Sequence, residues 1–298
     1  MKIFFTGISG FIGGSVAARF LKAGHEIRGL VRKPEYVDQL IAMGITPVLG
    51  NLSDRDILIK NAQWSDAVVN AASSDNLAAV EALIEGLAGF NKPLVHTSGS
   101  SLVGDDARGE FASQKIFDES TPIEPSPLKA ARIALDRVVM NASKRNVRSV
   151  ILCNSLIYGD GLGINKDSVQ LPRLIKQAKK SGVARHVGKG LNIWSNVHIK
   201  DVVELYLLAL KNAPAGSFYF VENGSASFVE ITTAIAKRLG LGAPQDWAHE
   251  EAVKEWGFEH ATYGLGCNSR VSAEKARREL HWAPIYNSVV NCIENELD

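Results

Sequence analysis

The sequence predicts an α/β fold in which a doubly wound parallel sheet is followed by a smaller C-terminal lobe. Three observations carry this prediction. A glycine-rich turn at residues 7–13 joins an apolar run to a helical pattern, apolar strands alternate with helical segments up to about residue 155, and that regularity falls beyond residue 160. We expect a sheet domain at 1–160, completed by segments near 190–222, and an interleaved lobe at 161–298.

The first 31 residues form a strand, a turn, a helix and a second strand in order. Gly7, Gly10 and Gly13 follow the apolar run at 3–5, and a helical pattern begins at Phe11. The first glycine permits the tight turn, the second lets backbone approach a pyrophosphate, and the third lets the helix pack on the strand. We therefore expect a Rossmann-type dinucleotide site, with the phosphates at the helix N-terminus. Its expected contacts are Gly7, Ser9, Gly10, Phe11, Ile12 and Gly13.

The end of the second strand indicates which dinucleotide is bound. An NAD site usually places an acidic residue there to hold the ribose hydroxyls. This chain instead continues from Val31 into Arg32 and Lys33. Two cations beside the adenosine ribose suit a 2′-phosphate, so the sequence favours NADP over NAD. A solvated basic pair at a strand end is the alternative.

The remaining elements are predicted from apolar runs and helical periodicity. Segment 99–127 is predicted to be a loop at the carboxyl edge of the fifth strand, where such sheets bind substrate. The predicted strands are 25–31, 46–50, 67–70, 94–97, 150–153 and 217–220. The predicted helices after the first are 128–143, 168–181, 199–212, 227–239 and 272–281.

Composition and charge narrow the class of protein. The 298 residues carry a net charge of +1, and no long basic cluster appears, which argues against a nucleic-acid partner. No run of about 18 apolar residues is present, so no membrane partner is expected. The three cysteines have no metal-type spacing, and the chain begins directly with a strand pattern. We expect a cytoplasmic protein with reduced thiols and a small-molecule substrate.

Motifs along nearly the whole chain resemble the extended short-chain dehydrogenase/reductases, the NAD-dependent epimerase/dehydratase group. They are TGISGFIGG, GNLSDRD, VVNAAS, LVHTSGSSLVG, LIYGDG, NVHIKDVVELYLLAL and SAEKARRELHWAP. The resemblance implies that Ser100 matches the catalytic Ser or Thr after the fifth strand. It also implies that the helices from about Asn76 and Leu128 could form a homodimer face. Further cofactor contacts are implied for Asn51, Leu52, Ala71, Ala72, Ser73, Ser98, Arg132, Asn154 and Leu156.

The chain departs from the group at its catalytic pair. Leu128 stands where the group has Tyr, and Arg132 stands where it has Lys, as in the atypical branch of the family. In the ordinary enzymes the Tyr hydroxyl exchanges the proton at the carbonyl, and the Lys lowers the Tyr pKa and holds the ribose. Leu128 cannot transfer a proton, whereas Arg132 can still hold ribose hydroxyls.

Substitute groups for the missing Tyr are few. Ser100 is expected to polarise a carbonyl, with a strand-end cap as its alternative role. Tyr158 is expected to face the same crevice and is a candidate acid. Lys129 lies about 100° around the helix from the Tyr position and is expected to point away. His198 and Asp201 begin a helix, where capping is the simpler role.

Three functions remain open. The leading one is an NADP-dependent oxidoreductase of small carbonyl or hydroxyl compounds without the usual proton donor. The second is a non-catalytic NADP-binding sensor or regulatory protein. The third, sugar-nucleotide epimerisation or dehydration, would need cations such as Arg173, Arg270 and Arg277 in the C-terminal lobe. The seven scattered histidines suggest no metal site.

Overall fold

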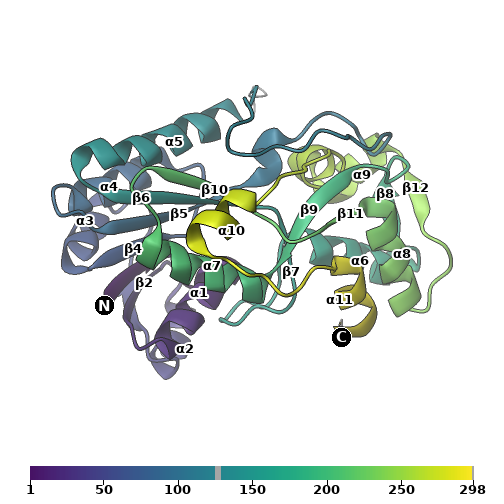
Figure 1. The fold of residues 1–298 in the computed structure, drawn as a ribbon. Helices are drawn as coiled ribbons and strands as arrows, with labels where there is room; N and C mark the ends of the chain where they lie inside the picture. The colour runs from purple at the N-terminus through teal and green to yellow at the C-terminus, as the bar shows by residue number, and fades with distance from the viewer. Residues whose placement is uncertain (125–128, 297–298) are drawn as a thin grey trace.

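Seven parallel strands form the central sheet, as the sequence predicts. The structure is a computed structural model that describes residues 1–124 and 129–296 (Figure 1). The strand order reverses between β1 and β4, which opens a crevice at their carboxyl ends. In spatial order the strands are β10 (Ser217–Val221), β6 (Arg148–Asn154), β5 (Pro93–Gly99), β4 (Ala67–Asn70), β1 (Lys2–Thr6), β2 (Glu26–Val31) and β3 (Thr46–Leu49).

Helices cover both faces of this sheet. Side chains alternate along β1, so Ile3 and Phe5 enter one apolar core while Phe4 enters the other. The first core is closed by α1 (Phe11–Lys22), α2 (Val37–Ala42), α7 (Ile199–Asn212) and α10 (Glu274–Leu280). The second is closed by α3 (Arg55–Trp64), α4 (Leu77–Leu87) and α5 (Ala130–Asn141). Short 3₁₀ turns are η1 (Pro34–Tyr36), η2 (Ser100–Val103) and η3 (Ala142–Arg145).

A smaller lobe lies beside the carboxyl edge of the sheet (Figure 1, right). Its apolar core runs from Leu156 to Ile293, so segments distant in the sequence build it together. Its strands are β7 (Leu156–Tyr158), β9 (Ile193–His198) and β11 (Ser225–Ser227) in one sheet, and β8 (Arg185–Val187) and β12 (Gln245–Trp247) in another. Its helices are α6 (Gln170–Ser181), α8 (Phe228–Arg238), α9 (His249–Trp256), the π-helix η4 (His260–Gly264) and α11 (Val289–Glu296).

Two predicted elements differ from the structure. Of the segments near 190–222, β10 completes the large sheet, whereas β9 pairs with β7 and β11 instead. The helix predicted to start at residue 128 begins at Ala130 in α5, and Leu128 lies outside the described residues. Within 1–124 and 129–296, no helix has the length and apolar character needed to cross a bilayer.

Candidate functional site

The glycine turn after β1 is packed too tightly for any side chain at two of its positions. Gly7 has a φ of +72°, and a Cβ there would lie 2.5 Å from the carbonyl carbon of Ala71. A Cβ on Gly13 would lie 2.3 Å from the carbonyl oxygen of Gly7. The turn therefore holds the start of α1 against β1 and the end of β4. Gly10 precedes α1 and offers no side-chain cap, which leaves N–H groups of the first turn free for an anion.

A pocket of about 620 Å³ lies over this turn and suits the adenosine half of a dinucleotide. It collects the residues that follow β1, β2, β3 and β4, as the strand order requires. None of the residues that line it is acidic. They are Gly7, Ser9, Gly10, Leu30, Arg32, Lys33, Tyr36, Gly50, Asn51, Leu52, Ser53, Ala71, Ala72 and Asn76.

The two cations of this pocket differ in their partners. Lys33 Nζ lies 3.2 Å from Glu35 Oε1, so its charge is partly balanced within its own loop. Arg32 lines the pocket at the end of β2, where the sequence placed it. Asn51 also lines the pocket, but its side-chain NH2 donates to Asp54 Oδ2 at 2.9 Å and thereby shapes the loop. Because Lys33 is paired with Glu35, Arg32 is the better placed of the two cations to meet a ligand phosphate.

A second pocket of about 500 Å³ continues from the first, because Gly10 and Ala71 line both. Phe11 and Ile12 at the start of α1 also line it. The remaining lining residues are Ser98, Gly99, Ser100, Ser101, Lys129, Arg132, Asn154, Ser155, Ile157, Asn165, Asp167, Ser168, Val169, Gln170, Trp194, Glu259, His260, Tyr263 and Gly264. Residues from both lobes therefore enclose the space in which a nicotinamide and a substrate would meet.

Asn154 supplies a buried acceptor beside the second pocket. Its side-chain NH2 donates to Tyr206 Oη at 3.2 Å, while its Oδ1 is buried without a partner among the described residues. An unpaired buried oxygen is unfavourable unless a ligand donates to it. This oxygen is closed off from the pocket, so the fit to a dinucleotide rests on the tight glycine turn and the uncapped start of α1.

Arg132 is held at the wall of the second pocket by a paired contact. Its Nε and Nη2 donate to the two carboxylate oxygens of Asp75 at 2.8 and 2.6 Å, and its Nη1 donates to Ser101 Oγ at 3.1 Å. The hydrogen bond from Arg132 holds the pKa of Asp75 below its ordinary value. Arg132 thus reaches the pocket predicted for it, but it is fixed by an acid that no motif indicated.

Ser100 and Ser101 have different hydrogen-bonding freedom. Ser269 Oγ donates to the carbonyl oxygen of Ser100 at 2.8 Å, so its proton is already in use. In the 2.8 Å contact between the two hydroxyls, Ser100 must then be the donor. Ser101 Oγ accepts from Arg132 and keeps its own proton available. Ser101, which sequence reasoning passed over, is therefore better suited than Ser100 to polarise a carbonyl oxygen.

Ser98 lines the second pocket but directs its hydroxyl into a buried polar network. Ser98 Oγ donates to Asp136 Oδ2 at 2.8 Å, and burial raises the pKa of Asp136 to about 7. His96 Nε2 lies 3.8 Å from Asp136 Oδ1, and burial lowers the pKa of His96 to about 4. Asn70 Nδ2 donates to His96 Nδ1 at 2.9 Å, so the neutral ring carries its proton on Nε2, facing Asp136.

Four predicted site residues line neither pocket, namely Gly13, Ser73, Leu156 and Tyr158. Leu156 and Tyr158 both point into the apolar core of the small lobe, whereas Ile157 between them lines the second pocket, because side chains alternate along β7. Tyr158 Oη donates to the carbonyl oxygen of Tyr286 at 3.1 Å, so the expectation that it faces the crevice as an acid is wrong. Ser73 Oγ accepts from the N–H of Asp75 at 3.2 Å and supports that loop.

Lys129 lines the second pocket, contrary to the helical-wheel argument. Because α5 begins only at Ala130, Lys129 precedes the helix and its direction does not follow the helical period. Local sequence patterns do not fix the start of a helix such as α5 to one residue.

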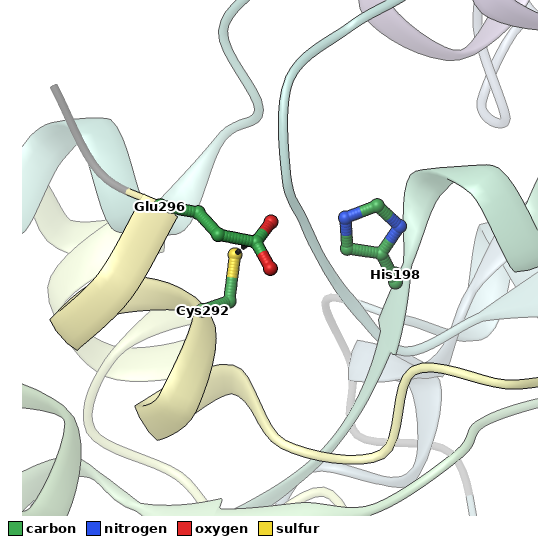
Figure 2. Close-up of side chains that lie close together, drawn as sticks. All are labelled: His198, Cys292 and Glu296. Carbon is green, nitrogen blue, oxygen red and sulfur yellow. Dashed lines mark hydrogen bonds between the residues drawn. The ribbon is translucent and has the colours of Figure 1, made fainter.

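His198, Cys292 and Glu296 form a cluster that the spacing of the histidines did not reveal. Figure 2 shows His198 facing two side chains of α11, and one ligand atom of each residue lies within 4.8 Å of the others. His198 Nδ1 accepts the N–H of Lys200 at 3.1 Å and caps α7. The neutral ring therefore carries its proton on Nε2, which leaves that nitrogen no lone pair for a metal. The cluster is better explained as a helix cap packed against α11.

Comparisons with known proteins agree with this architecture. A model of the NAD dependent epimerase/dehydratase family matches residues 3–221. An uncharacterised protein of Schizosaccharomyces pombe is 30% identical over 99% of each chain. A 4-hydroxy-2-methyl-3-oxo-4-farnesyl-3,4-dihydroquinoline-1-oxide ketoreductase of Stigmatella aurantiaca is 26% identical over 95% of this chain and 92% of its own. The solved dTDP-glucose 4,6-dehydratase of Bacillus anthracis, in complex with NAD, shares the fold with a TM-score of 0.79 and 19% identity over 100% and 95% of the two chains.

Proposed function

We propose, from the premise that this chain belongs to the NAD-dependent epimerase/dehydratase family, that it is an NADP(H)-dependent oxidoreductase. Its substrate would be a small carbonyl or hydroxyl compound, and it would work without the usual Tyr. One observation carries the proposal. The adenosine pocket and the second pocket adjoin at Gly10 and Ala71, and together they make a groove that crosses the reversal point of the sheet.

The choice of NADP rests on the charges at the adenosine end of this groove. Arg32 and Lys33 line it, and no Asp or Glu does. A carboxylate there would accept from ribose hydroxyls and would repel a 2′-phosphate, whereas a guanidinium can bind that phosphate with two parallel N–H groups. Arg32 therefore supports NADP over NAD.

The lining of the second pocket supports a small carbonyl substrate with an apolar body. Phe11, Ile157 and Trp194 supply apolar surface, while Ser101 and Arg132 supply donors. The ketoreductase name of the Stigmatella relative points to the same kind of reaction. When bound, the reduced cofactor supplies a hydride. Arg132 would hold ribose hydroxyls, and Ser101 would stabilise charge that grows on the carbonyl oxygen.

The cofactor half of the proposal is tested by titrating NADPH and NADH into the protein and into Arg32→Ala. We expect NADPH to bind at least about tenfold more tightly than NADH, because each charged contact to a phosphate contributes roughly 1.5–3 kcal/mol. Arg32→Ala should remove most of that preference while leaving NADH affinity nearly unchanged. Tighter binding of NADH by the parent protein would refute the choice of NADP.

Turnover is tested by screening aldehydes, ketones and quinones for NADPH oxidation. Losing general acid help slows such a reaction roughly 10²–10⁴-fold without forbidding it, so slow turnover is the expected result. The non-catalytic alternative, an NADP-binding sensor, is favoured by Leu128 at the Tyr position. Binding without turnover across the whole panel would support the sensor and reject the enzyme.

Sugar-nucleotide chemistry receives less support from the cations of the C-terminal lobe. Arg277 Nη1 lies 2.8 Å from Glu222 Oε1, and Arg270 donates to the carbonyl oxygen of Ser113 at 2.8 Å. Arg173 Nη2 lies 3.0 Å from His260 Nε2. All three arginines therefore already serve contacts within the protein rather than pointing to a diphosphate.

A further inference from the structure

The second pocket contains a buried cation that the family pattern does not provide. The side chain of Lys129 is only 5% exposed, and its Nζ lies 3.2 Å from Glu259 Oε1. The same Nζ lies 5.5 Å from the centre of the Tyr263 ring. An ammonium has three N–H donors. Glu259 takes one, so the Lys129 ammonium keeps donors for a ligand in the pocket that it lines.

Four other polar groups in and near this pocket, Arg132, Ser100, Tyr158 and His260, are poorly suited to give a proton to substrate. Arg132 keeps its proton at any relevant pH. Ser100 is committed to Ser269, and Tyr158 is buried in the small lobe. His260 Nε2 accepts from Arg173, and burial lowers the pKa of His260, so the ring is neutral at pH 7. Lys129 combines a transferable proton, burial and a place on the pocket wall.

We propose that Lys129 is the proton donor that replaces the missing Tyr, an inference that rests on the proposed reductase function. Hydride adds to the carbonyl carbon, the π electrons of the C=O bond move to oxygen, and that oxygen takes a proton from the Lys129 ammonium. The products are the alcohol, the oxidised cofactor and a neutral amine. The amine regains its proton from solvent beside Glu259, whose side chain is 70% exposed.

Glu259 acts in this scheme as a positioning residue. It directly precedes the π-helix η4, whose residues His260, Tyr263 and Gly264 also line the pocket. The ion pair with Lys129 therefore joins the start of α5 in the sheet domain to a segment of the small lobe. The catalytic acid would then be complete only when the two lobes are packed together.

The decisive variants are Lys129→Met and Lys129→Arg, with Lys115→Met as the matched control. Lys115 Nζ also lies over an aromatic ring, 4.3 Å from the centre of Phe117, but it is exposed and outside this pocket. We expect both Lys129 variants to lower kcat about 10²–10³-fold while NADPH affinity changes less than about twofold, as loss of a general acid predicts. Lys115→Met should leave both values unchanged.

Chemical rescue separates proton donation from a structural role. In Lys129→Ala, added ethylammonium should raise kcat at least about tenfold. In Lys115→Ala, which we expect to be as active as the parent, ethylammonium should leave kcat unchanged. A raised KM with unchanged kcat, or full activity in Lys129→Arg, would instead show that Lys129 only binds substrate and would overturn the proposal. So would a kcat in Lys129→Met within threefold of the parent.

A further readout needs no bound cofactor. Hexanal and cyanoborohydride at pH 9 should label the Lys129 amine in the cofactor-free protein, because a carbonyl seated in the pocket meets that amine. Exposed Lys115 serves as the internal reference for reactivity in peptide mass spectrometry. Labelling of Lys115 alone would overturn the proposal. If the parent protein binds NADPH but reduces no carbonyl, the reductase function fails together with this inference, whereas an active parent with an unaffected Lys129→Met variant refutes this inference alone.

Discussion

The two ends of the groove are built in different ways. The adenosine pocket is formed by backbone and by residues that directly follow four neighbouring strands. The second pocket is held by paired side chains that are distant in the sequence, such as Arg132 with Asp75 and Lys129 with Glu259. A steric fit at the first end leaves little room for substitution, whereas the second end can change its chemistry through single side chains while the fold persists.

The largest expected effect is at the adenosine pocket, where the glycine turn is tightly packed. Gly13→Val should weaken NADPH binding by roughly 100-fold or more, because its Cβ must push the carbonyl oxygen of Gly7 away from 2.3 Å and so displace the turn. Fluorescence titration measures this, with circular dichroism as the check on folding. Gly242→Ala is the control, since its Cβ would meet nothing within 4 Å. NADPH affinity within threefold of the parent would contradict the steric account.

The next largest effect is expected in the second pocket, where two adjacent serines should differ in their contribution to kcat. Ser101→Ala should lower kcat about 10–100-fold, because it removes the donor that remains free for the carbonyl oxygen. Ser100→Ala should change kcat less than about threefold and lower the unfolding free energy by about 1 kcal/mol, since it loses the contact to Ser269. Steady-state kinetics and denaturant unfolding of both variants test this. The reverse order of kcat effects would restore Ser100 as the polarising residue.

Behind Ser98 of the second pocket, Asp136 should make stability depend on pH. Its folded pKa is raised to about 7 from an ordinary 3.8, so between about pH 4 and 7 the folded state holds a proton that the unfolded chain has lost. The unfolding free energy should therefore fall as pH rises through this window and stay level above it. Asp136→Asn should remove the fall and stabilise the protein by about 1–3 kcal/mol at pH 8.

Urea unfolding of the parent protein and of Asp136→Asn at pH 4 and pH 8 measures this pH dependence of the unfolding free energy. His96 contributes an opposite slope, because its lowered pKa of about 4 leaves the folded state with fewer protons than the unfolded chain. Because His96 contacts Asp136, the difference between the two proteins reports the Asp136 carboxyl together with its contact to His96. Equal destabilisation of Asp136→Asn at both pH values would show that the carboxyl is not raised in pKa.

The smallest effect is expected at Tyr158, away from both pockets. Tyr158→Phe removes only the hydrogen bond to the carbonyl oxygen of Tyr286, so the unfolding free energy should fall by about 0.5–1.5 kcal/mol. Turnover should stay within twofold of the parent. A tenfold loss of kcat with NADPH binding intact would mean that Tyr158 reaches the substrate after all.

The sequence by itself determined the parallel sheet and the residues of the adenosine pocket. Gly7, Gly10 and Arg32 lie within one strand–turn–helix–strand unit, whose geometry follows from steric rules and local periodicity. The sheet order then brings Asn51 and Ala71 to the same edge, because carboxyl ends of parallel strands share that edge.

Only the tertiary structure decided which side chains carry donors at the other end. Ser100 and Ser101 differ through Ser269 and Arg132, and Lys129 reaches the pocket because α5 starts one residue after it. Tyr158 was misplaced because a one-residue shift along β7 exchanges core for pocket. Hydrogen-bond direction and the exact start of an element depend on partners distant in the sequence, and local patterns do not encode them.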